Sequence, residues 1–185
     1  MKTIFINDKC TANEFRTLFA SSTEELRWLC YTLTGNDELT DNALDAALEQ
    51  SVKGAGHVFR EWMLSWTRRI LIKYCISVVR PSQSPLARCA YPLFPMMFET
   101  VRESQVAEVL AQPSDILQQK LLKLDDLSRF VFVLRALEGY SRHDAALLLN
   151  IDDRACEWTF VWAVGTLGSD MQEQQRKFEQ VLQYA

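Results

Sequence analysis

The residues best suited to binding chemistry lie between positions 60 and 80, where basic and aromatic side chains are interleaved. The basic residues of this stretch are Arg60, Arg68, Arg69, Lys73 and Arg80. They are opposed by a single acid, Glu61, so the local charge is +4. Cationic side chains bind phosphates, and the rings of Trp62 and Trp66 can stack on unpaired bases. The stretch therefore predicts a nucleic-acid contact; the alternative is that the tryptophans belong to the core and the basic residues form a solvated face.

A second candidate site lies in residues 137–167, LEGYSRHDAALLLNIDDRACEWTFVWAVGTL. A short helix, a tight turn and a longer helix are the elements of a helix-turn-helix, whose second helix enters a DNA groove. However, residues 140–167 hold two basic residues, Arg142 and Arg154, against four acids, a local charge of −2. The second helix also carries Trp158 and Trp162. Its shape and its charge thus indicate different partners.

No arrangement of side chains typical of catalysis occurs in the sequence. The two histidines, His57 and His143, do not stand at a recognisable catalytic spacing from a nucleophile and a carboxylate. The adjacent Asp125 and Asp126 are interpreted as residues of the first turn of a helix. The cysteines form no CxxC pair, which indicates free thiols in a reducing compartment. They are Cys10, Cys30, Cys75, Cys89 and Cys156. We therefore predict a protein that is not an enzyme and needs no metal or cofactor.

The composition of the whole chain is that of a folded protein without a membrane span. Of its 185 residues, 48% are hydrophobic and 24% are charged, and a chain of this length can bury a core without disulfides. The net charge of −4 argues against nucleic-acid binding over the entire surface, so any such contact must be local. The N-terminus lacks the apolar stretch of a signal peptide, and no run of 18 apolar residues occurs. We expect a cytoplasmic protein.

The elements that must position these residues are helical and form two groups. All five prolines lie between positions 81 and 113, and proline interrupts helices. On both sides the apolar residues follow helical spacing, without the alternation typical of strands. We predict an all-α protein in which two small helical bundles, residues 1–80 and 114–185, are joined by a proline-containing linker over 81–113. The C-terminal bundle would contain the helix-turn-helix.

In the first bundle, capping residues and glycines predict three helices. Ser22 and Glu25 have the spacing of a capping box, and the helix that follows should end at Gly35. Asp37 would cap the second helix, over 37–50. The third helix is expected over about 58–79. The side chains expected to be buried on this third helix are Phe59, Met63, Trp66, Ile70 and Tyr74.

In the second half, a short helix near the end of the linker should precede four more helices, over about 114–123, 125–138, 142–149 and 152–167. Gly139 would end the second of these, and Ser141 would cap the third. The residues expected to face inward on the last one are Cys156, Phe160, Ala163 and Leu167. Those left outward would be Arg154, Glu157, Trp158, Val161 and Trp162. A terminal helix over 172–185 would follow.

One segment of the second bundle, LDDLSRFVFVLRALEGYSRHDAALLLNID, follows a known pattern. In this pattern an apolar run precedes Glu-Gly-Tyr-Ser, which is followed by an acidic residue, an alanine and paired leucines. The matching residues are Leu124, Arg129, Val131, Leu134, Glu138, Gly139, Tyr140, Ser141, Asp144, Ala146, Leu149 and Ile151, with Ala163 and Leu167 beyond them. The pattern resembles that of the extracytoplasmic-function (ECF) sigma factors of bacterial RNA polymerase. The resemblance implies a helix-turn-helix that contacts promoter DNA.

The first bundle resembles the N-terminal domain of the same family more loosely. LTGNDELTDNALDAALEQ is similar to the segment that binds the clamp helices of the polymerase. This would give Asp41, Asn42 and Asp45 that role, although Asp45 stands where the family has a glutamine. FREWMLSWTRRILIK is similar to the segment that contacts the promoter and helps to melt it. The residues that the resemblance assigns to DNA here are Arg68, Arg69, Lys73 and Arg80.

The second helix of the helix-turn-helix departs from the family pattern, because Thr159 and Trp162 stand where the family usually has arginine or lysine. Three hypotheses follow. In the first, the helix binds promoter DNA weakly, and its contacts are Arg142, Arg154, Trp158 and Trp162. In the second, Trp158, Val161 and Trp162 form a face that docks another protein. In the third, the terminal helix covers this face with Phe178, Val181 and Leu182.

Together, the residues and the resemblance predict an ECF-like sigma factor that binds core RNA polymerase and promoter DNA and catalyses no reaction. The alternative is a diverged protein of the same architecture that keeps a protein-interaction role and has lost specific DNA binding. An anti-sigma protein or another protein partner is compatible with both.

Overall fold

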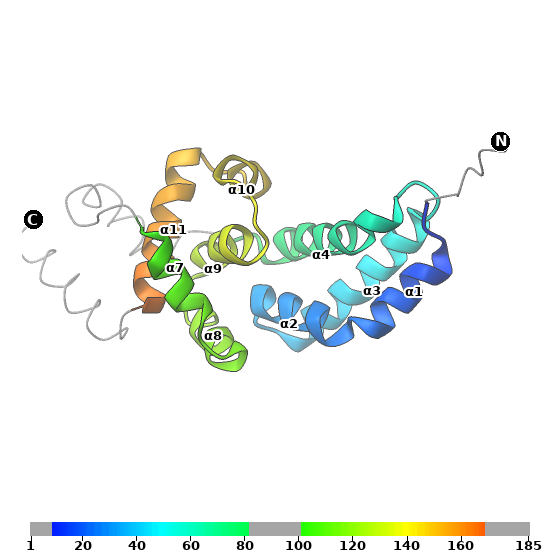
Figure 1. Ribbon diagram of the computed structural model, residues 1–185, viewed down its shortest axis with the longest axis horizontal. Helices are drawn as coiled ribbons and strands as arrows, with labels where there is room; N and C mark the ends of the chain where they lie inside the picture. Colours follow the sequence, from blue (N-terminus) through cyan, green and yellow to red (C-terminus); the bar gives the residue numbers. More distant parts are fainter. Residues whose placement is uncertain (1–8, 82–100, 169–185) are drawn as a thin grey trace, which may run out of the picture. The chain divides into compact units, whose positions relative to one another are not determined.

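The computed structural model describes residues 9–81 and 101–168 (Figure 1). Within these residues the secondary structure is helical, with one isolated antiparallel bridge between Lys9 and Phe59. The prediction of an all-α fold is therefore confirmed. The chain divides into two compact units, one up to Arg80 and the other from Pro81 onward.

The described part of the first unit is built from five helical segments. They are α1 (Ala12–Ser21), α2 (Thr23–Thr34), α3 (Asp37–Lys53), the short 3-10 helix η1 (Arg60–Trp62) and α4 (Met63–Val79). Gly35, with a φ of 63°, ends α2 as predicted, because glycine adopts this left-handed conformation without a steric penalty. The helix expected over 58–79 instead begins with the 3-10 turn.

Two helix caps predicted in this unit are wrong. Ser22 follows α1 directly and closes its last turn, and in this backbone conformation its side chain makes no cap to α2. The capping box stands at the start of α1, where Glu14 N donates to Thr11 Oγ1 (3.3 Å) and Thr11 N donates to Glu14 Oε2 (2.7 Å). The cap of α3 is Asn36, one residue before the predicted Asp37, and its Oδ1 accepts a backbone N–H at 2.9 Å.

The core of the first unit forms where α3 packs against α4. Small residues recur at every fourth position on the buried face of α3, and these are Ala43, Ala47 and Ser51. Short side chains allow a neighbouring helix to pack close to the helix that carries them. The facing residues that α4 buries, also at every fourth position, are Thr67, Leu71 and Cys75. This small-residue seam sets the rotation of α4 about its own axis.

The buried face of α4 therefore differs from the predicted one. Phe59 and Trp66 are each 41% exposed, and Met63, Ile70 and Tyr74 are only partly buried. The prediction placed the largest apolar side chains inward. The small-residue seam instead takes a face about a third of a turn away, at 100° per residue of a 3.6-residue turn. The larger side chains are left nearer to the surface.

The described helices of the second unit are α7 (Glu103–Leu110), α8 (Ser114–Leu121), α9 (Asp126–Phe132), the π-helical turn η2 (Val133–Leu137), α10 (Arg142–Leu149) and α11 (Asp153–Gly168). α7 lies inside the segment expected to be the linker. It nevertheless packs against α11 and buries Val109. The helical packing of the second unit thus begins before residue 114.

α9 and η2 form the centre of the second unit. Every residue from Phe130 to Leu134 is fully buried, so this helix is covered on all sides. The wider π-helical turn of η2 is followed by Gly139, whose φ of 69° ends the helix as predicted. Asp125 caps α9 by accepting a backbone N–H at 3.1 Å, so only Asp126 lies in the first turn.

α10, a tight turn and α11 form the predicted helix-turn-helix (Figure 1). Ser141 caps α10 as predicted, with its Oγ accepting from Asp144 N at 3.1 Å. Asn150 adopts a left-handed conformation, with a φ of 53°, and ends α10. The four residues predicted to face inward on α11 are all buried: Cys156, Phe160, Ala163 and Leu167. The helix predicted over 172–185 lies outside the described residues.

Candidate nucleic-acid interface

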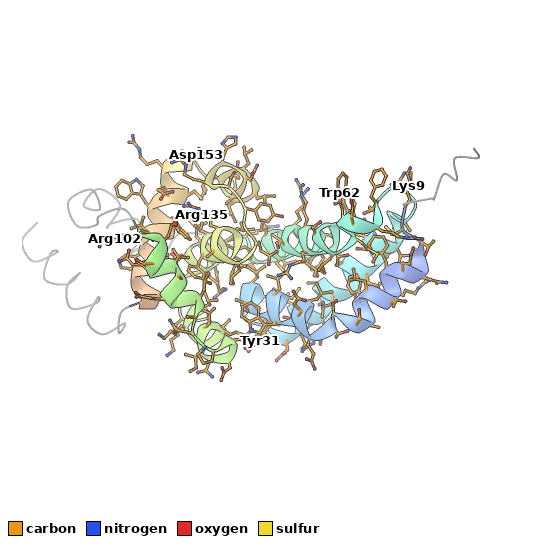
Figure 2. All side chains as sticks on the ribbon, viewed as in Figure 1. Lys9, Tyr31, Trp62, Arg102, Arg135 and Asp153 are labelled. Atoms are coloured by element: carbon orange, nitrogen blue, oxygen red, sulfur yellow. The ribbon has the colours of Figure 1, made fainter. Side chains whose placement is uncertain are left out.

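The outward face of α4 and of the turn before it brings aromatic and basic side chains into one stripe. Trp62, Trp66, Arg69 and Lys73 are separated by four, three and four residues, which places them on the same face of a helix. All four are exposed, Trp62 to 57% and Trp66 to 41%. Trp62 projects away from the ribbon of the first unit (Figure 2). We call these four residues the α4 stripe.

The α4 stripe combines two groups that bind different parts of a nucleic acid. Neither Arg69 nor Lys73 makes an ion pair with another residue of the described segments, so their charges are not neutralised there. Exposed indole rings are poorly hydrated and stack on unpaired bases, whatever the base. The stripe can therefore hold phosphates and bases of one strand at the same time.

Arg68, which the resemblance assigned to DNA, does not lie on the α4 stripe. It forms an ion pair with Glu25 of α2, and its side chain is only 23% exposed. This ion pair joins α2 to α4, so the Arg68 side chain points toward α2. Arg80 is exposed and adopts a left-handed conformation, with a φ of 49°, as the residue that ends α4. Of the four assigned cations, Arg69 and Lys73 are thus the two placed beside the tryptophans.

Phe59 extends the α4 stripe at its N-terminal end. The centroid of its ring lies 5.4 Å from that of Trp62, with the planes at 77°, which is an edge-to-face contact. Helical spacing in the sequence predicts Phe59 to be buried, so it was not among the predicted binding residues. The available signal was its place three residues before Trp62, directly after the loop over residues 54–58.

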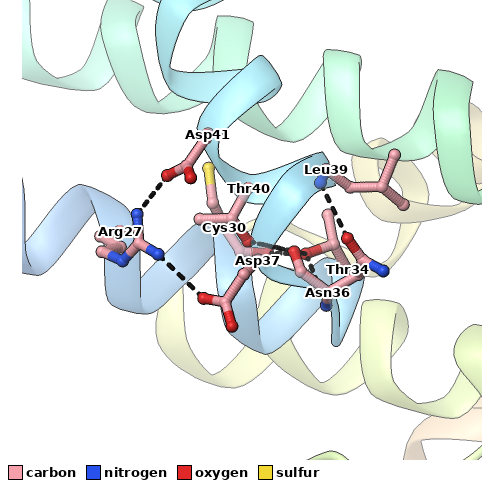
Figure 3. Close-up of polar contacts among 8 residues, drawn as sticks. All are labelled: Arg27, Cys30, Thr34, Asn36, Asp37, Leu39, Thr40 and Asp41. Carbon is pink, nitrogen blue, oxygen red and sulfur yellow. Dashed lines mark hydrogen bonds and ion pairs between the residues drawn. The ribbon is translucent and has the colours of Figure 1, made fainter.

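The residues assigned to polymerase binding lie on the exposed side of α3. Asp41, Asn42 and Asp45 are all exposed. Arg27 of α2 lies between Asp41 and Asp37 and forms an ion pair with each, at 2.8 Å for Asp37 (Figure 3). The carboxylates of Asp41 and then Asp37 raise the pKa of the Arg27 guanidinium. Asp41 is therefore held in one orientation by its own unit.

Buried hydroxyls order the α2–α3 connection that presents these acids (Figure 3). Thr34 Oγ1 donates to Cys30 O at 2.9 Å and lies 3.0 Å from Thr40 Oγ1. Thr40 Oγ1 in turn donates to Asn36 O at 2.7 Å. Because buried polar groups are costly to leave unpaired, this network fixes the connection. The network thus fixes the start of α3, whose first turn carries Asp37 and whose second turn begins with Asp41.

In the helix-turn-helix, one of the two cations assigned to DNA already faces an acid of the same unit. Arg142 Nε lies 3.6 Å from Asp153 Oδ2, and His143 Nδ1 lies 3.2 Å from Oδ1 of the same carboxylate. These contacts tie the start of α10 to the start of α11. Arg154 is exposed. The positive charge that this face could offer to phosphates is smaller than the sequence predicts.

A second arginine near the helix-turn-helix is also engaged within the unit. Arg135 of η2 donates to Glu157 of α11 at 2.7 Å, and its guanidinium lies 4.1 Å from the centre of the Phe160 ring. Its side chain is mostly buried by these contacts. Arg135 therefore packs η2 against α11, and it neutralises the negative charge of Glu157 within the unit.

Acidic side chains occupy the N-terminal ends of both helices of the helix-turn-helix. Asp144 accepts from Ser141 Oγ at 2.6 Å in the first turn of α10, and Asp152 accepts from Ala155 N at 2.8 Å at the start of α11. Helix N-termini attract anions through their free N–H groups and the helix dipole. Here the carboxylates already take that place and repel phosphate.

The outward face of α11 is smaller than predicted. Val161, expected to face outward, is only 7% exposed, and Thr159 is buried as well, because α7, α9 and α10 all pack against α11. Trp158 and Trp162 are partly buried. The hypothesis that a terminal helix covers this face concerns Phe178, Val181 and Leu182, which lie outside the described residues.

Comparison with known proteins does not assign this chain to a family. No protein-family model, curated protein or solved structure matches it. What indicates a function is the geometry of the two units. The first has an exposed aromatic and basic stripe, and the second has a helix-turn-helix in which Arg142 faces Asp153 and Glu157 pairs with Arg135 of η2.

The described residues contain no cluster of three or more histidine, cysteine or acidic side chains that could hold a metal ion. The described cysteines are buried free thiols, and these are Cys10, Cys30, Cys75 and Cys156. A hydrogen bond with Cys75, together with burial, raises the pKa of Cys30, and a thiol that stays protonated is a poor nucleophile. Cys89 lies outside the described residues. No helix among them is both long and apolar enough to cross a membrane.

Proposed function

We propose that the first unit binds an unpaired segment of promoter DNA and that the protein acts, in the bacterial cytoplasm, as an ECF-like sigma factor of core RNA polymerase. The observation that supports this most is the α4 stripe, with two exposed indole rings beside two cations. Stacking of a base on an aromatic ring contributes about 1–3 kcal/mol, and each phosphate contact adds salt-dependent affinity. A duplex keeps its bases stacked inside, so the stripe favours the opened strand.

The exposed acids of α3 supply the polymerase contact in this proposal. Asp41, Asn42 and Asp45 form a polar, negatively charged surface that fits a basic surface of a partner. Arg27 fixes Asp41 before binding, which lowers the entropy that binding must remove. The protein itself performs no catalytic step, and the chemistry of transcription belongs to the polymerase.

A second candidate function is a protein-interaction module with the same architecture. It is favoured by the pairing of Arg142 with Asp153, which leaves Arg154 as the one arginine of the described helix-turn-helix that makes no ion pair. A bidentate contact to a base contributes about 1–3 kcal/mol of discrimination and needs a free donor. In this case the second unit docks a protein and adds little to DNA recognition.

Binding to labelled oligonucleotides tests the first proposal. The wild-type chain, alone or with core polymerase, should bind a single strand more tightly than the duplex of the same sequence. The logarithm of the affinity should fall with the logarithm of salt concentration by about 0.7 per phosphate held on a single strand. The double variant Arg69→Ala with Lys73→Ala should lower that slope by about 1.4. Arg68→Ala is the matched control, because Arg68 is paired with Glu25. Equal affinity for single strand and duplex in both settings would contradict the proposal.

Capture by core RNA polymerase tests the assignment of the acids on α3. The variant Asp41→Ala with Asp45→Ala should bind polymerase more weakly than wild type. Glu49→Ala is the control, because Glu49 is an exposed acid of the same helix that the resemblance does not assign to the polymerase. Mobility shift with promoter DNA then separates the two candidate functions. The interaction module would bind polymerase without specific DNA binding.

A further inference from the structure

Phe59 lies beside the α4 stripe in an arrangement that a core does not explain. Its ring and that of Trp62 meet edge to face at 5.4 Å, yet the two residues are 41% and 57% exposed. An aromatic pair at the surface leaves apolar area in water, which is unfavourable unless something else covers it. The pair therefore has a use other than filling the interior.

The backbone that carries Phe59 is held by the segment before α1. Cys10 N donates to Val58 O at 2.9 Å, and Gly56 N donates to Cys10 O at 2.8 Å. Cys10 Sγ also donates to Val58 O at 2.9 Å, and the bridge between Lys9 and Phe59 continues this pairing. Lys9 and Trp62 lie at the same end of the first unit (Figure 2).

The residues on either side of Phe59 are anchored by side chains as well. Val58 is buried in a cluster with Cys10 and Phe15, against which Met63 packs. Arg60 Nε pairs with Glu14 of α1 at 2.8 Å. The position of Phe59 is thus fixed from both sides, while its ring remains at the surface against Trp62.

We infer that Phe59 is a positioning residue for Trp62. The segment before α1 fixes Phe59, and the edge-to-face contact with the Phe59 ring holds the Trp62 indole in one orientation, with area left open for a base. A ring that is already oriented loses less rotamer entropy when a base stacks on it. This inference rests on the proposed function, in which the α4 stripe binds single-stranded DNA.

Substitutions at Phe59 test the inference through affinity and its salt dependence. Phe59→Leu keeps an apolar side chain and removes the ring, so affinity for a labelled single strand should fall about 2- to 10-fold. Phe59→Tyr keeps the ring and should bind like wild type. The salt slope should be unchanged in both, because Arg69 and Lys73 keep their phosphate contacts. Leu64→Ala is the matched control, since Leu64 is an exposed apolar residue of α4 outside the stripe, and it should have no effect.

Fluorine NMR of the protein labelled with 5-fluorotryptophan observes the orientation of Trp62 directly. Trp62→Phe identifies the signal, which Phe59→Leu should shift and broaden while that of Trp66 stays in place. An unchanged Trp62 signal, or an altered salt slope in Phe59→Leu, overturns the inference. If the wild-type chain fails to bind single strands, the proposed function fails, and the Trp62 signal still decides whether Phe59 orients the indole.

Discussion

The α4 stripe and the helix-turn-helix both place tryptophans near basic residues, but the two units use the positive charge differently. On α4, Arg69 and Lys73 make no ion pair within the described residues. In the second unit, Arg142 and Arg135 face the carboxylates of Asp153 and Glu157. The comparison shows that the number of basic residues on a helix is a poor guide to nucleic-acid binding. What decides is whether the fold has already paired them.

The same difference separates residues that bind from residues that stabilise. An exposed, unpaired cation contributes little to folding and is available to a phosphate. A cation that is mostly buried against an aromatic ring and a carboxylate stabilises the fold, and exposing it to a ligand would cost those contacts. Arg69 is of the first kind and Arg135 is of the second.

Reversing the charges of the two units gives the largest expected effect. Arg69→Glu with Lys73→Glu should weaken single-strand binding about 100-fold or more at low salt, because two attractive contacts become repulsive. Arg142→Glu with Arg154→Glu changes the net charge equally and should alter this binding about threefold or less. Fluorescence anisotropy with a labelled oligonucleotide measures both. Equal losses of affinity in the two variants would show that net charge alone controls binding. The pairing of cations within the fold would then not decide which of them bind nucleic acid.

The stability of the fold should depend more on the paired arginine of the second unit than on the unpaired arginine of the α4 stripe. Arg135→Ala removes the contact with the Phe160 ring and the ion pair with Glu157, and should lower the free energy of unfolding of the second unit by about 1–2 kcal/mol. Arg69→Ala should change the stability of the first unit by no more than about 0.5 kcal/mol. Urea unfolding followed by circular dichroism gives both values. A larger loss for Arg69→Ala would mean that Arg69 holds the fold together.

Releasing the paired cations of the second unit should create some affinity for DNA. Asp153→Asn with Glu157→Gln removes two negative charges and frees Arg142, while Arg135 stays packed against the Phe160 ring, so duplex affinity should rise about three- to tenfold. The control is Glu108→Gln with Asp115→Asn, which changes the net charge equally at exposed acids of α7 and α8 that make no ion pair within the described residues. A mobility shift with duplex DNA compares the two. An equal gain in both variants would show a general charge effect.

The sequence predicts the glycines that end helices, because this signal is local, but two of its predicted N-caps, Ser22 and Asp37, are wrong. Gly35 and Gly139 adopt left-handed conformations where predicted, and Ser141 caps α10 through its own side chain. The rotation of α4 could not be predicted in the same way, because it depends on small residues in α3. Apolar size alone placed Phe59 and Trp66 in the core, and the fold leaves them at the surface.

The candidate site was predictable in composition but not in geometry. The tryptophans and cations of the α4 stripe were identified from the sequence, since residue type and spacing along one helix are enough for that. The pairing of Arg68 with Glu25 joins residues 43 positions apart, and that of Arg135 with Glu157 joins residues 22 apart. Such contacts depend on which helices pack together. No pattern within one segment reveals them.

Lowering the pH should slightly weaken the contacts that hold the residues beside the α4 stripe. The group that titrates is Glu14, which pairs with Arg60. The Thr11 backbone N–H, and then its hydroxyl, lower the pKa of Glu14 below its ordinary value of 4.5. A carboxyl whose pKa is lowered by folding stabilises the fold above that ordinary value, and this contribution is lost as the pH falls through the folded pKa. The stability of the first unit should therefore begin to decline as the pH drops below about 4.5.

Glu14→Gln keeps the acceptor of the capping box but does not titrate, so its acid decline should be shallower than that of wild type. Glu49→Gln is the control, because Lys53 lowers the pKa of Glu49 through an ion pair that lies away from the stripe. Both variants should flatten the acid limb of a thermal-melting series. Only Glu14→Gln should also remove a pH dependence of the Trp62 fluorine signal, because only Glu14 pairs with Arg60 beside Phe59. The same change in that signal for both variants would mean that low pH destabilises the whole first unit. The segment before α1 would then not determine the position of the α4 stripe.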